Sequence, residues 1–221
     1  MPRRQTFSYW VSRVKKLSDK ESDDHVAAAE YAECLSEVFG DLYSITAEGA
    51  DAYWQTTHTI VANGSVSYDE PDDHLSTVCL EYVSGSGERR PLTKLLAQER
   101  YTYSPSSIGL IGGSANAYSL IDDQLFLYPK PTSGTYELLY IPQPPDLTSY
   151  ADTDMVDVVS IYGEQFLVYG AAALVKSKSE DDVRFFLQRQ ARAEQKLIEW
   201  AAQRSFHDGQ HRFSDFGGGD D

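Results

Sequence analysis

The chain has 221 residues, 41% of them hydrophobic, so it can bury the core of one sizeable domain or two small ones. Its formal net charge is −15, from 19 basic and 34 acidic residues, which argues against a surface that grips nucleic acid through clustered Lys and Arg. The two cysteines, Cys34 and Cys79, form no CxxC motif, which argues against a zinc site or a disulfide framework and predicts free thiols in a reducing compartment.

The N-terminal segment, residues 1–53, is predicted to be helical. Phe7, Trp10 and Val14 recur at the spacing of one helix face. Gly40 is well placed to end a second helix. The three helices predicted in this segment cover residues 6–17, 24–39 and 45–53.

The pattern changes at Trp54, where β-branched and aromatic residues begin to alternate with polar ones. This change predicts an inserted β-rich unit over residues 54–147, with a short helix over residues 93–100 and a surface loop over residues 104–117. The last two strands are expected to form a hairpin, because prolines and a glycine lie between them. The predicted strands cover residues 54–61, 75–83, 118–121, 125–128 and 136–141.

Two long helices are predicted in residues 148–204. They cover residues 155–176 and 180–203. Gly163 and Gly170 lie seven residues apart, hence near the same face of the first of these helices. Because glycine is costly inside a helix, the pair predicts a close approach by a neighbouring helix. The predicted fold class is α+β, a helical bundle from the N- and C-terminal helices with an inserted small antiparallel β-unit.

The final segment, residues 205–221, is predicted to be a flexible tail, because it is polar and rich in glycine. It nevertheless carries three aromatic residues, Phe206, Phe213 and Phe216. Aromatic residues spaced along a flexible tail are typical of a peptide that binds a neighbouring surface. The alternative interpretation is a disordered terminus without a partner.

No pattern in the sequence predicts a catalytic, cofactor or metal site. His207 and His211 lie four residues apart but flank Gly209 in the polar tail, which does not hold them on one face. The acidic-histidine cluster at residues 72–74 is interpreted as a solvated loop rather than acid–base machinery. The longest apolar run, residues 166–175, is too short to span a bilayer, and the N-terminus lacks the apolar region of a signal peptide. We therefore expect no enzyme, no cofactor and no membrane contact.

Three sequence patterns follow one another in an informative order. Residues 66–73 contain a tyrosine–proline–aspartate segment before a strand, residues 125–147 contain two strands that end near Pro-x-Pro and Pro-x-Asp-Leu, and residues 166–175 form an alanine-rich helix before an acidic one. This order resembles the head-to-tail adaptor (neck) proteins of tailed bacteriophages over most of residues 55–203. Before the first proline the family usually has an apolar residue, where this chain has Glu70.

The resemblance implies a structural adaptor that forms a ring, expected to be a dodecamer, between the portal and the tail. Such a ring would belong to the virion neck, assemble in the host bacterial cytoplasm, extend the DNA channel and present a platform for a tail or nozzle protein. DNA would pass through without sequence-specific binding, and an acidic wall would repel its phosphates. Under this interpretation Phe206, Phe213 and Phe216 dock onto the portal protein.

The chain has more aromatic side chains than a compact monomer of this size readily buries, which predicts surfaces that pair between subunits of a ring. Phe185 and Trp200 lie off the main apolar stripe of the last helix. Their side chains are therefore expected either at a subunit interface or buried under the β-unit. The candidate subunit-interface residues are Trp10, Trp54, Gly163, Gly170, Phe185 and Trp200. Two alternative functions remain open: a carbohydrate- or peptide-binding module, from the tyrosine-rich strands, and a hydrolase with dispersed carboxylates.

Overall fold

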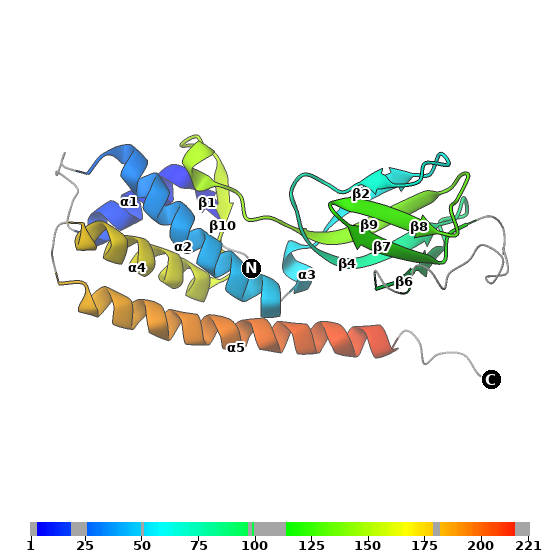
Figure 1. The fold of residues 1–221 in the computed structure, drawn as a ribbon. Coiled ribbons are helices and arrows are strands. Elements are labelled where there is room, and N and C mark those ends of the chain that lie inside the picture. The colour runs from blue at the N-terminus through cyan, green and yellow to red at the C-terminus, as the bar shows by residue number, and fades with distance from the viewer. Residues whose placement is uncertain are drawn as a thin grey trace. The chain divides into compact units, whose positions relative to one another are not determined.

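The computed structural model describes residues 4–18, 26–49, 51–96, 99, 114–178 and 182–214. The chain divides into two compact units (Figure 1). Residues 1–53 and 144–221 form the first, which we call the helical unit, and residues 54–143 form the second, the β unit. The predicted α+β class is confirmed, since N- and C-terminal helices pack together and the intervening strands form mostly antiparallel sheets.

The helical unit is built around α4, which packs against three other helices of the unit, α1, α2 and α5 (Figure 1). Because neighbours cover most of its sides, α4 is apolar on nearly every face. The two short strands of the unit, β1 and β10, pair antiparallel. The elements are β1 (Arg4–Thr6), α1 (Phe7–Leu17), α2 (Ala28–Gly49), the 3-10 helix η2 (Leu147–Ser149), β10 (Met155–Asp157), α4 (Ile161–Ser177) and α5 (Arg184–Ser214), while α3 (Asp51–Trp54) crosses the boundary between the units.

Hydroxyl side chains begin two of these helices. The Thr6 hydroxyl accepts a hydrogen bond from the backbone N–H of Tyr9, 3.3 Å away, at the start of α1. The Ser160 hydroxyl accepts one from the N–H of Gly163 at 3.2 Å, at the start of α4. Each cap satisfies a backbone donor that has no partner within its own helix.

Several predicted helix boundaries were wrong, and the separate helix predicted over residues 45–53 is instead the end of α2 followed by the short α3. Helix α2 continues past Gly40 to Gly49, because its buried stripe continues through Leu42 and Tyr43 and packing outweighs the cost of one glycine, about 1 kcal/mol. The helix predicted from residue 155 begins only at Ile161, since the preceding residues pair with β1 as strand β10. Helix α5 runs on to Ser214, into the segment predicted to be a flexible tail, and residues 215–221 lie outside the described part of the chain.

Within its described residues, the β unit contains two four-stranded sheets. The strands of the first, in spatial order, are β2 (Thr56–Val61), β9 (Thr135–Pro142), β4 (His74–Val83) and β5 (Arg89–Pro91); those of the second are β3 (Tyr68–Asp69), β8 (Gln124–Tyr128), β7 (Ala117–Ile121) and β6 (Thr93–Lys94). Only the β6–β7 pair among these described strands is parallel. Both sheets contribute to one buried cluster, which consists of Ile60, Ala62, Leu80, Leu92, Ala115, Tyr118, Leu125, Leu127, Tyr136, Leu138 and Tyr140.

Two predictions about the β unit were wrong. Strands β8 and β9 do not pair as a hairpin, since β8 pairs with β3 and β7 while β9 pairs with β2 and β4. The proline-rich turn between them therefore carries the chain from one sheet to the other. The short helix predicted over residues 93–100 begins instead as strand β6, where the N–H groups of Thr93 and Leu95 donate to Asn116 and Tyr118 beside or in β7. Most of the predicted loop at residues 104–117 lies outside the described residues.

Candidate functional site

Three of the predicted interface residues are buried inside the helical unit. Trp10 is 1% exposed, so it stabilises the core of its own chain and has no surface to offer a neighbour. A Cβ on Gly163 would collide with the carbonyl oxygen of Val158, and a Cβ on Gly170 would lie 2.7 Å from a Val38 methyl group. The predicted close approach of a neighbouring helix is confirmed at Gly170, where the close side chains belong to α2 and α5 of the same chain, whereas at Gly163 the closest atom belongs to the segment that precedes α4. The prediction that Trp10, Gly163 and Gly170 contribute to a subunit interface is therefore corrected, because all three pack within their own chain.

The other three candidates retain some exposure. Phe185, on α5, is 53% exposed, and its ring makes edge contacts with Tyr169 and Phe186. Trp200 is half-buried with its ring edge-on to Tyr53, and Trp54 is also half-buried. Phe185 is thus the most accessible of the predicted interface residues.

The tail prediction falls mostly outside the described side chains. The backbone of Phe206 and Phe213 lies within α5, while Phe216 lies outside the described residues. The last buried side chain described on α5 is that of Ala201, which is 1% exposed. The described side chains that follow it, residues 202–204, are exposed.

A basic groove runs along one flank of α5, between α5 and α4. It has a volume of about 350 Å³, and Gln165, Tyr169, Arg189, Arg192 and Lys196 line it. The three cations are spaced by three and four residues, which places them on one face of the helix, and all three are exposed. The spacing of these cations is visible in the sequence, but the groove itself depends on the packing of α5 against α4 and was not predicted.

An acidic groove runs along the other flank of α5, between α5 and α2. It has a volume of about 380 Å³, and Asp41, Ser44, Ile45, Leu187 and Glu194 are among the residues that line it. Further carboxylates extend the negative charge along α2, because Glu33, Glu37, Asp41 and Glu48 are all exposed at spacings of four, four and seven residues. This stripe was also missed, although its period is that of one helix face.

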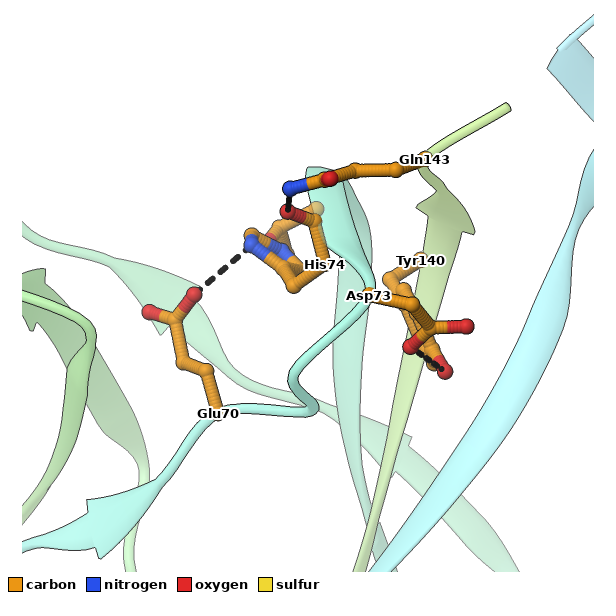
Figure 2. Close-up of polar contacts among 6 residues, drawn as sticks. Glu70, Asp73, His74, Tyr140 and Gln143 are labelled. Carbon is orange, nitrogen blue, oxygen red and sulfur yellow. Dashed lines mark hydrogen bonds and ion pairs between the residues drawn. The ribbon is translucent and has the colours of Figure 1, made fainter. Parts of the chain in front are cut away.

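A largely buried carboxylate–imidazole contact anchors the start of β4 in the β unit (Figure 2). The Glu70 carboxylate lies 2.7 Å from Nδ1 of His74, and only 8% and 14% of the two side chains are exposed. Nε2 of His74 lies 2.8 Å from the Thr77 hydroxyl oxygen. His74 is thus part of a strand, so the predicted solvated loop was wrong for this residue. An acidic side chain is tolerated at position 70 because His74 provides its partner.

A second pair ties the same loop to the end of β9 (Figure 2). The Tyr140 hydroxyl donates to the Asp73 carboxylate at 2.9 Å, and the Gln143 side-chain amide donates to the His74 carbonyl oxygen at 3.4 Å. The backbone N–H of Gln143 also donates to the Asp73 carbonyl oxygen, at 2.6 Å. Burial, and then the hydrogen bond to Asp73, raises the pKa of Tyr140 to about 12, so the phenol stays protonated at neutral pH and remains a donor. The donors and acceptors of this network are paired with one another, which stabilises the loop rather than presenting a base to a substrate.

The described residues contain no group of three His, Cys, Asp or Glu side chains arranged to hold a metal ion. Among the helices in the described part of the chain, none combines the length and the apolarity needed to cross a membrane. Among the grooves of the described surface, the two on either side of α5 carry opposite charges on opposite flanks of one helix.

Comparison with known proteins identifies a family for the chain. A family model described as SU10 adaptor protein matches residues 9–214, which include nearly all of the helical unit and the whole β unit. A search of curated proteins finds no matching sequence.

Proposed function

Because this chain belongs to the SU10 adaptor protein family, a family of phage adaptors, we propose that it is a structural adaptor that forms a ring between the portal and the tail of the virion. The predicted membership of a phage adaptor family is confirmed at the level of the family. The observation that carries the proposal is the extent of the match, since residues 9–214 span both units.

In this role the protein acts by shape and not by catalysis. The ring extends the DNA channel and gives a tail or nozzle protein a platform on which to dock. A net charge of −15 suits a wall along which DNA slides, because like charges keep phosphates from binding. The exposed apolar side chains of α5 suit a chain that assembles, since Phe185, Leu187 and Ile198 are 53%, 50% and 51% exposed.

The finer proposal concerns the assembly. The ring is a dodecamer in the virion neck, built in the cytoplasm of the host bacterium. Its C-terminal segment, with Phe206, Phe213 and Phe216, docks onto the portal protein. Support comes from α5, whose described buried positions end at Ala201 while its backbone continues as helix to Ser214.

The test is to co-express the full chain with the portal protein of its phage and to purify the complex through a tag on the portal. Electron micrographs should show an added ring on the portal, and native mass spectrometry should count twelve copies of this chain. A chain that stays monomeric and joins neither portal nor tail protein would overturn the proposal.

A further inference from the structure

We propose that the basic groove of one copy docks onto the acidic groove of a second copy, an inference that rests on the proposed ring and names the surfaces that meet in it. The occupant of the basic groove is therefore the α2–α5 flank of a neighbouring chain. Arg192 and Lys196 on one side meet Glu37 and Asp41 on the other.

The cations of the basic groove are available to a partner. Arg192 forms no hydrogen bond or ion pair with any other residue in the described part of the chain. Lys196 and Arg189 lie over aromatic rings, 5.4 Å from the centre of Tyr162 and 5.3 Å from the centre of Phe185. These contacts hold the charged groups over ring faces but leave them without a carboxylate. Glu199 is the acidic residue among those that line this groove.

The carboxylates of the acidic groove are similarly available. In the described ranges, the ion pairs of the helical unit join Arg13 to Glu164 and Lys178 to Glu30, and they leave Glu37 and Asp41 unpaired. Leu187 and Ile198 lie on the same side of α5 and are 50% and 51% exposed. A partner that carries cations on aliphatic stems would cover this apolar surface and neutralise the acidic rim.

The two grooves point in opposite directions. At about 100° per residue, Arg189, Arg192 and Lys196 lie roughly half a turn around α5 from Leu187 and Glu194, with the buried stripe between them. Opposite charges on opposite flanks of one helix suit a head-to-tail contact, in which each copy uses both surfaces. Such heterologous contacts build a closed ring when the rotation between copies closes.

A second copy is favoured over nucleic acid because its acidic flank is also apolar. The net charge of −15 repels DNA phosphates and a second copy alike, so charge does not separate the two. The neighbour's flank additionally carries the exposed side chains of Leu187 and Ile198, which can cover the exposed Phe185 ring over which Arg189 lies.

The inference is tested with charge reversals at exposed positions, which leave the core intact. The double variant Arg192→Glu with Lys196→Glu, and the double variant Glu37→Lys with Asp41→Lys, should each weaken self-association about tenfold or more, because attraction becomes repulsion at two positions. Combining all four changes in one chain should restore association. The variant Arg192→Lys with Lys196→Arg keeps the charges and serves as the matched control. Sedimentation velocity and circular dichroism report association and folding.

A second measurement locates the contact directly. Carbodiimide joins amines to touching carboxylates, so treatment of the portal-bound protein should yield dimers in which Lys196 is linked to a carboxylate of α2. Dimers linked only at other positions, or an association that nuclease treatment abolishes, would overturn this inference while the ring remains. A wild-type chain that never associates with itself, with or without the portal, would overturn both this inference and the proposed function.

Discussion

The close approach at Gly163 provides a sharp test of how the helical unit packs. Changing Gly163 to Ala places a Cβ against the carbonyl oxygen of Val158, with Leu42 Cδ1 3.2 Å away. The obstacle is backbone, so the chain must shift to relieve it. Overpacking typically costs about 1–3 kcal/mol, and a collision with a fixed carbonyl belongs at the upper end of that range. Replacing a helical glycine by alanine returns about 1 kcal/mol, so the expected net loss is about 2 kcal/mol.

Gly40 is the matched control, because it also lies inside a helix but has nothing within 4 Å of an added Cβ. Gly40→Ala should stabilise the chain by about 0.5–1 kcal/mol. Gly170→Ala should fall between the two, since its closest obstacles are the side chains of Val38 and Gln190, each 2.7 Å away, and side chains can move.

The assay is thermal unfolding followed by circular dichroism at the helix band. For a chain of this size about 1 kcal/mol shifts Tm by roughly 2–4 °C, so Gly163→Ala should lower Tm by about 4–8 °C while Gly40→Ala raises it by about 1–4 °C. Equal Tm values for these two variants would refute the inferred collision at Gly163.

Three further outcomes are expected. Changing His74 to Ala should lower the unfolding free energy of the β unit by about 3 kcal/mol in urea unfolding, because it leaves the shielded Glu70 carboxylate unpaired. Replacing both residues by Leu should recover much of that loss. A double variant whose loss equals the sum of the two single losses would contradict the pairing. Hydrogen bonds from the Thr148 N–H, the Thr148 hydroxyl and the Ser36 hydroxyl lower the pKa of Asp146, so the ionised carboxylate stabilises the fold above its unfolded pKa near 3.8 and this contribution is lost as the pH falls through the folded pKa. Asp146→Asn should therefore reduce the dependence of the unfolding free energy on pH in that acidic window. An unchanged acid dependence would count against this assignment. Deleting residues 205–221 should preserve the circular dichroism of the core and weaken portal binding, and a pull-down as strong as that of the full chain would contradict the proposed docking.

Much of the helical unit follows from local sequence. The spacing of Phe7, Trp10 and Val14 predicts both α1 and its buried face, and all three side chains are buried. The costly pair Gly163 and Gly170 predicts a close approach, and both positions are buried against neighbours. Periodicity carries this information because a helix face depends only on residues three and four apart.

The choice of partner could not be predicted in the same way. Gly163 and Gly170 mark a crowded surface, but the spacing alone does not say whether that surface meets α2 and α5 of the same chain or a neighbouring subunit. The sequence likewise does not say whether Trp10 lies in the core or at an interface. In the structure it lies in the core of the helical unit and is 1% exposed. The number of aromatic side chains indicates how much apolar surface must be buried, but it does not say whether the same chain or a neighbouring subunit buries it.

The β unit shows the same division. Alternation located the residues of β4, β7, β8 and β9, but it did not show that β8 and β9 belong to different sheets. It also did not show that Glu70 would find a partner in His74, or that residues 155–157 would pair with β1 rather than begin α4. The sequence by itself thus determined the longer helices and strands, the α+β class and the family. The tertiary structure alone decided the strand pairs, the burial of the interface candidates and the opposed grooves of α5, because these depend on contacts between residues that are distant in the chain.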